Sequence, residues 1–149
     1  MKQTTEALVV DASVVAKWHL RDESDVDKAD LLLARFIAGD VALVAPEQIR
    51  YEIPSTISVA TVGKTPRMRI EDGQAAIEMF LAFGLQTFST NALILNAYAL
   101  VHQHAIAFYD GLYLALSHQL DIPLITADNR LYQRVKSLPE VIWIGDYQP

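Results

Sequence analysis

The feature that most constrains the fold is a short apolar run, Leu8 to Val10, that ends directly in Asp11. A run of this length, rich in β-branched residues, is typical of a strand buried on both faces and is too short to indicate a helix. A carboxylate that ends such a strand lies at the carboxyl edge of a sheet, where open α/β folds bind their ligands. Ser13 follows two positions later, so we expect its hydroxyl on the same side as the Asp11 carboxylate.

The composition indicates a single folded domain, which we expect to span residues 1–149. Hydrophobic residues make up 52% of the chain and charged residues 20%, so the apolar surface is sufficient for a core and a disordered chain is excluded. The apolar runs are too short to cross a membrane, and Glu6 interrupts what would be the core of an export signal. The chain has no cysteine, which excludes disulfides and thiolate metal sites and is compatible with the cytoplasmic location that we expect.

The formal net charge of −6 argues against a protein that coats nucleic acid, because such proteins carry a basic surface. It argues less against a metal-dependent nuclease, since the site of such an enzyme is itself built from carboxylates. One basic segment, KTPRMR at 64–69, could be either a solvated connector or a contact for RNA.

Apolar runs and helix breakers alternate along the chain. Strands are predicted at 8–10, 41–44, 85–88, 123–126 and 141–144. Helices are predicted at 14–20, from Ser24 to Gly39, from Pro46 to Gly63, at 71–83, at 90–103, at 110–120 and at 128–135. Ser13 is expected to cap the first helix, and Pro54 to kink the third. Strands that alternate with helices favour a parallel sheet covered on both faces.

Two of the predicted strands end in the same pattern of a hydroxyl and a carboxylate. Asp11 and Ser13 follow the first strand, while Thr126 and Asp128 stand at the end of the strand at 123–126. If these two strands are neighbours in the sheet, Asp11 and Asp128 converge at one edge.

Two more carboxylates are placed where they could join this edge. Asp110 lies near a predicted helix start among apolar residues, where an unpartnered charge would be costly, and Glu52 lies within the third helix. Clustered carboxylates repel one another at neutral pH and therefore bind either a proton or a cation. Oxygen ligands without cysteine or clustered histidine favour Mg²⁺ or Mn²⁺, which can hold a phosphodiester oxygen and activate water.

Most of these residues also have a purely structural interpretation. Asp110 and Asp128 could each be a helix N-cap, and Glu52 could be a solvated helix residue. The two strand-end hydroxyls could be simple caps. Asp11 has the weakest structural interpretation, because a charge that ends a fully apolar strand needs a reason to be there.

The motifs, taken in order, resemble the PIN-domain ribonucleases, and most closely the small VapC-type toxins of prokaryotic toxin–antitoxin pairs. The motifs are DAS at 11–13, YEI at 51–53, FYD at 108–110 with LYLALS at 112–117, and TAD at 126–128. The resemblance covers essentially the whole chain. It implies a three-layer α/β/α fold with a mostly parallel central sheet, and a Mg²⁺- or Mn²⁺-dependent endonuclease that hydrolyses RNA.

The resemblance also assigns roles residue by residue. The four acidic positions of the family are occupied here by Asp11, Glu52, Asp110 and Asp128. The three aspartates would be the metal ligands, directly or through water, and Glu52 would bind a second ion or orient water. Ser13 and Thr126 would support these ligands through hydrogen bonds.

The chain departs from the family pattern at a few positions. Ser55 stands where asparagine is frequent, Pro54 is unusual in that helix, and Gly111 replaces a common alanine. The resemblance also implies partners: a cognate antitoxin whose basic segment would enter the acidic cleft, and a second copy of the chain, for which the apolar segment 75–83 offers surface.

Other interpretations remain open. A response-regulator receiver needs a paired acid and a late lysine, and a haloacid-type phosphatase needs a second aspartate where this chain has Ser13. The main alternative is a PIN-like scaffold that binds RNA or protein without cutting.

Overall fold

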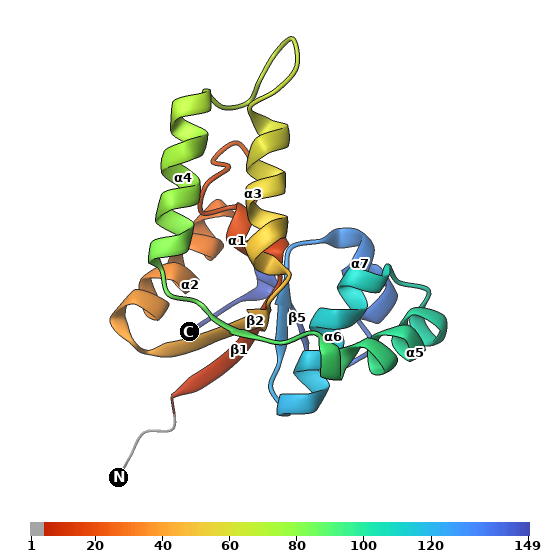
Figure 1. Cartoon of the computed structure of the whole chain (residues 1–149). Coiled ribbons are helices and arrows are strands. Elements are labelled where there is room, and N and C mark those ends of the chain that lie inside the picture. The colour runs from red at the N-terminus through yellow and green to blue at the C-terminus, as the bar shows by residue number, and fades with distance from the viewer. Residues whose placement is uncertain (1–4) are drawn as a thin grey trace.

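Strands and helices alternate in the computed structural model, which describes residues 5–149 (Figure 1). The strands are β1 (Glu6–Val10), β2 (Val41–Pro46), β3 (Gln86–Phe88), β4 (Leu124–Thr126) and β5 (Val141–Trp143). All neighbouring strands pair in parallel, in the order β3-β2-β1-β4-β5. The apolar run from Leu8 to Val10 is therefore the buried centre of the sheet, as its sequence predicts.

Helices flank this sheet on two sides and confirm the predicted α/β class. They are α1 (Ala12–Ala16), α2 (Val26–Ala38), α3 (Ile49–Ala60), α4 (Ile70–Ala82), α5 (Ile94–His104), α6 (Phe108–Leu120) and α7 (Asn129–Val135), with 3-10 turns η1 (Asn91–Leu93) and η2 (Ile144–Asp146). Helix α2 packs on β2, and α6 packs on β1, β2 and β4. In Figure 1, α2 lies to the left of the sheet and α5 and α6 lie to its right, while α3 and α4 stand side by side beyond the strand ends. Among the residues that are described, every helix is too short or too polar to cross a membrane.

Helix α6 is buried along most of its length and anchors one side of the sheet. Residues 111–117 are all buried, and α5 packs directly against them. Gly111 permits this close approach, because a Cβ built at that position would lie 2.9 Å from the carbonyl oxygen of Ala97. The residue that departs from the family pattern therefore lies at the contact between the two helices.

The prediction that Pro46 opens a helix is wrong. Pro46 is the last residue of β2 and pairs with Phe88 of β3, and α3 begins only at Ile49. A proline at a strand end does not interrupt the hydrogen bonds within the sheet, so its preference for the first helical turn does not decide its place here. Helix α3 continues through Pro54 as one element.

Several predicted helix ends are also wrong. The first helix ends at Ala16 rather than Leu20, and its N-cap is Asp11, not Ser13. The second helix has Asp25 as its N-cap, with a left-handed backbone (φ 56°), in place of Ser24. The helix predicted from Asp110 begins two residues earlier, so Asp110 lies inside it and is not its cap. The predicted stop of the second helix at Gly39 is confirmed, with a φ of 81°.

Candidate functional site

The carboxyl ends of β1 and β4 bring Asp11 and Thr126 together. The two strands pair in parallel with Val10 opposite Ile125, so the next residue on each strand reaches the same edge of the sheet. Thr126 Oγ1 donates a hydrogen bond of 2.9 Å to Asp11 Oδ2, and Ser13 Oγ donates to the same oxygen. Both hydroxyls thus reach one carboxylate oxygen of Asp11, and within residues 5–149 the other oxygen, Oδ1, receives no side-chain hydrogen bond.

Both hydroxyls also accept a hydrogen bond from the backbone that follows β4. The N–H of Ala127 donates to Ser13 Oγ at 2.9 Å, and the N–H of Asp128 donates to Thr126 Oγ1 at 3.0 Å. Each hydroxyl therefore joins the Asp11 carboxylate to the segment that carries Asp128. Neither acts as a helix cap, since Asp11 and Asp128 occupy the N-cap positions of α1 and α7.

Asp128 has a structural role that the sequence predicts. Its Oδ1 accepts hydrogen bonds from the backbone N–H groups of Arg130 (2.8 Å) and Leu131 (3.3 Å) at the start of α7. These bonds fix the side chain at the strand end. The interpretation as an N-cap is confirmed, and the same residue also lines the pocket described below.

Glu52 is held by Tyr113, which lies within the LYLALS motif but was assigned no role from the sequence. The hydroxyl of Tyr113 donates a 3.0 Å hydrogen bond to Glu52 Oε1, and the Tyr113 side chain is fully buried. Burial, opposed by hydrogen bonds and assisted by the charge of Asp11, raises the pKa of Glu52 above its usual value. A tyrosine within the apolar pattern of α6 looks like a core residue, and only its placement three residues after Asp110 could have drawn attention to it.

The four predicted acidic residues meet in one pocket of about 350 Å³. Its lining includes Asp11, Glu52, Asp110 and Asp128, together with Ser13, Lys17, Glu23 and Thr56. Thr126 is fully buried and supports the pocket without lining it. The structure thus brings together β1, α3, α6 and the start of α7, which lie far apart in the sequence.

The carboxylates in this pocket disfavour one another's charge. Burial raises the pKa of Asp110 to about 7, and the negative charges of Asp11, Asp128 and Glu52 add to this effect. Burial also raises the pKa of Asp11, although the hydrogen bonds from Ser13 and Thr126 oppose the shift. Asp110 therefore exchanges a proton close to neutral pH, as expected where like charges are crowded.

One cation of the protein lies in the same pocket and was not predicted. Lys17 follows α1, is 6% exposed, and forms an ion pair of 3.3 Å with Glu23. Its position among the acidic residues gives the pocket wall one fixed positive charge, but Glu23 already faces this charge.

The donor chemistry of the pocket fits a hard divalent cation, because all four predicted side chains offer carboxylate oxygens. Within residues 5–149, however, no group of three or more Asp, Glu, His or Cys side chains is arranged so that it could hold one metal ion. The carboxylates share a pocket without forming a ready-made set of three ligands. Coordination by the aspartates stays a prediction.

Comparison with known proteins places this fold and site in a family. The family model for the PIN domain matches residues 8–137, a range that contains both strand-end motifs and all four acidic residues. The chain belongs to the PIN domain family. Ribonuclease VapC12 of Mycobacterium tuberculosis is 31% identical over 128 residues, which cover 85% of this chain and 90% of VapC12. The chain is thus a PIN domain of the VapC ribonuclease type, and the resemblance seen in its motifs is confirmed.

Solved structures of low sequence identity share the fold of this PIN domain. A toxin–antitoxin complex from Klebsiella pneumoniae contains a chain with a TM-score of 0.61 at 15% identity, covering 97% of this chain and 100% of that one. VapC20 of M. tuberculosis, a toxin that cleaves the sarcin–ricin loop, also has a TM-score of 0.61 at 15% identity, covering 85% and 93%. The family assignment leaves the receiver and phosphatase interpretations without support.

Proposed function

We propose that this VapC-type PIN domain is a divalent-cation-dependent endoribonuclease and the toxin of a toxin–antitoxin pair. The observation that carries the proposal is the single pocket in which Asp11, Glu52, Asp110 and Asp128 meet. VapC12, its relative at 31% identity, is a ribonuclease, which supports RNA as the substrate.

Mg²⁺ or Mn²⁺ would be held by Asp11, Asp110 and Asp128, directly or through water. A bound divalent cation would offset the carboxylate charge, polarise a phosphodiester oxygen and lower the pKa of a water molecule. Burial raises the pKa of Asp110 to about 7, and the nearby carboxylate charges add to this effect. The repulsion between these charges supports the assignment, since a cation relieves it as a proton does.

The protein's own groups have distinct roles in this proposal. Ser13 and Thr126 hold the Asp11 carboxylate through Oδ2, which would fix its position for a cation. Tyr113 orients Glu52, which would in turn orient the attacking water for in-line displacement. Such hydrolysis leaves a 5′-phosphate and a 3′-hydroxyl.

We also propose two protein partners. A cognate antitoxin with a basic segment would complement the acidic pocket, and the toxin–antitoxin complex from K. pneumoniae supports a partner of this kind. A homodimer is proposed as well, and within the predicted apolar segment 75–83 the exposed side chains of Met79 and Leu81 are available for such a contact.

The decisive experiment compares the wild-type protein with Asp11→Asn in cleavage of RNA. We expect the wild type to cut single-stranded RNA with Mn²⁺ or Mg²⁺ and to stop when EDTA is added, and we expect the variant to be inactive. Sequencing of the products should find 5′-phosphate and 3′-hydroxyl ends, and 2′,3′-cyclic phosphates would contradict the proposed hydrolysis. Expression in bacteria adds a second readout, because only the wild type should arrest growth.

The alternative function is a PIN-like scaffold that binds RNA or protein without cutting. It is favoured by one observation, the lack of a preformed three-ligand cluster among residues 5–149. A melting temperature that rises with Mn²⁺ in the wild type, but not in Asp11→Asn, would argue against the scaffold, because a ligand stabilises only the state that binds it. If Mn²⁺ does not change the melting temperature of the wild type, and the wild type does not cut RNA, the scaffold is favoured.

A further inference from the structure

An acidic pocket in a chain of net charge −6 has to attract a polyanion if it is to cut RNA. Arginine and lysine contacts to phosphates supply most of the affinity of proteins for nucleic acids. The proposed ribonuclease therefore needs positive side chains near the four carboxylates, and these side chains have to be free of acidic partners.

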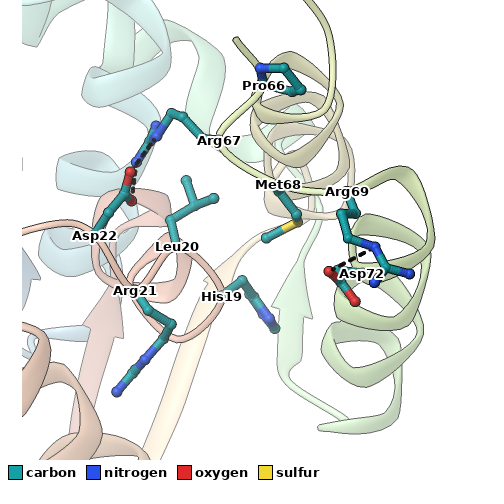
Figure 2. Close-up of a pocket in the computed structure, with 9 residues that line it drawn as sticks. All are labelled: His19, Leu20, Arg21, Asp22, Pro66, Arg67, Met68, Arg69 and Asp72. Carbon is teal, nitrogen blue, oxygen red and sulfur yellow. Dashed lines mark hydrogen bonds and ion pairs between the residues drawn. The ribbon is translucent and has the colours of Figure 1, made fainter.

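The basic connector at 64–69 does not meet this condition. It borders a hollow of about 480 Å³ between residues 19–22 and α4 (Figure 2). Figure 2 shows Arg67 facing Asp22, and the two side chains form an ion pair of 2.6 Å. Arg69 lies 3.7 Å from Asp72 in the same view.

The third arginine of this hollow is paired as well. Arg21 forms an ion pair of 2.6 Å with Asp30, and two hydrogen bonds join the guanidinium to the carboxylate. Each arginine of the hollow thus faces a carboxylate of the protein itself. The hollow contains none of the four site acids. RNA bound there would therefore meet neither an unpaired arginine nor the proposed metal ligands.

A second pocket, of about 290 Å³, adjoins the acidic one. The two pockets share Asp110 and Asp128 in their linings. Arg130 and Arg134 of α7 also line the second pocket. Because these residues are four positions apart on a helix, both guanidinium groups lie on one face.

Neither arginine has an acidic partner in the part of the chain that the structure describes. The ion pairs within 4.0 Å there involve Lys17, Arg21, Arg35, Arg67, Arg69 and His118. Arg130 and Arg134 are both exposed to solvent. Both nevertheless line the same pocket as Asp110 and Asp128.

We propose that Arg130 and Arg134 bind the RNA backbone phosphates next to the bond that is cut. This inference rests on the proposed ribonuclease function and adds the path by which the RNA strand would enter the site. A guanidinium group can bind phosphate oxygens through two parallel hydrogen bonds, and two such groups on one helix face can hold successive phosphates. The RNA would pass from this pair to the acidic pocket past Asp110 and Asp128, which line both pockets.

The test measures the binding of short single-stranded RNAs of random sequence in EDTA, where no cleavage occurs. The variants are Arg130→Ala, Arg134→Ala and the double variant, with Arg69→Ala as a control that removes the same charge at the hollow of Figure 2, which lies outside both pockets. We expect each α7 variant to weaken binding several-fold, and to lower the slope of log K against log salt by about 0.7 for each phosphate that is no longer bound. Arg69→Ala should change neither quantity, and Arg130→Lys with Arg134→Lys should keep the slope.

Other results separate this inference from the proposed function. The inference is overturned if the double variant binds RNA like the wild type, if Arg69→Ala weakens binding equally, or if the wild type binds no RNA at low salt. If the wild type cuts RNA while the double variant binds and cuts equally well, the ribonuclease stands and the phosphate contacts do not. If the wild type binds RNA through the two arginines but cuts none with Mn²⁺ or Mg²⁺, the contacts stand and the ribonuclease does not.

Discussion

Thr126 at the end of β4 donates a hydrogen bond to Asp11 at the end of β1, although 115 positions separate the two residues in the sequence. The same hydroxyl accepts a hydrogen bond from the backbone N–H of Asp128. One buried side chain therefore fixes the spacing between two of the proposed metal ligands. The TAD motif thus places one hydroxyl where it bonds both to the Asp11 carboxylate after β1 and to the backbone of Asp128 after β4.

Replacement of Thr126 by valine tests this relationship. Valine keeps the shape but removes one of the two hydroxyl hydrogen bonds to Asp11 Oδ2 and leaves the Asp128 N–H without its partner, which costs about 1–3 kcal/mol of folding free energy. We expect lower stability in urea denaturation and a lower rate of RNA cleavage. Thr126→Ser keeps the hydroxyl and should retain most of both, so equal losses in the serine and valine variants would show that packing, not the hydrogen bond, matters.

The raised pKa of Asp110 predicts that the stability of the protein in metal-free buffer depends on pH. This pKa rises from the ordinary 3.8 to about 7 on folding, mainly because the side chain is buried. Between these values the folded protein holds a proton that the unfolded chain has released, so stability falls as the pH rises through this window. Urea denaturation across the window should show this fall, and Asp110→Asn should reduce it. A slope that is unchanged in the variant would contradict the shift.

The same ionisation predicts how a divalent cation acts. A carboxylate has to lose its proton before it binds a metal, so the rise in melting temperature produced by Mn²⁺ should be larger above pH 7 than below it. Thermal melts with and without Mn²⁺ measure this difference. Asp11→Asn should remove the rise at every pH, whereas Arg69→Ala, outside the pocket, should keep it.

Local signals were sufficient for the parts of the site that lie at strand ends. The apolar run before Asp11 and the TAD motif each mark a buried strand that ends in a carboxylate, and parallel pairing of these strands then brings the two ends together. Pro46 shows the limit of such signals, because its helical preference is overridden by its pairing with Phe88 across the sheet.

Long-range partners explain what the sequence could not predict. Arg67 and Arg130 are both surface arginines when considered locally. Only the fold places Asp22 against the first and, among residues 5–149, leaves the second without an acidic partner beside the acidic pocket. Tyr113 likewise fits the apolar pattern of α6, and its hydroxyl gains a function only because α3 places Glu52 opposite it.

Tyr113→Phe should separate the role of this hydroxyl from its packing. The variant loses one hydrogen bond and about 1 kcal/mol of stability. We expect a lower kcat with little change in KM, because Glu52 loses its orientation while the arginines that bind RNA are untouched. In a Glu52→Gln background the same change should cause no further loss of kcat, since two residues that act through one contact are not additive. Fully additive losses would place Tyr113 outside the action of Glu52.

Gly111→Ala should destabilise the helix pair that carries Asp110. The new Cβ would lie 2.9 Å from the backbone carbonyl oxygen of Ala97, and α5 cannot yield without moving as a whole. Overpacking of this kind costs about 1–3 kcal/mol. Gly73→Ala is the matched control, because its Cβ would meet the side-chain methyl of Thr61 at 2.7 Å, and a side chain can move aside. Urea denaturation of both variants should find the larger loss at Gly111, and an equal or larger loss at Gly73 would show that the α5–α6 contact is not the tighter one.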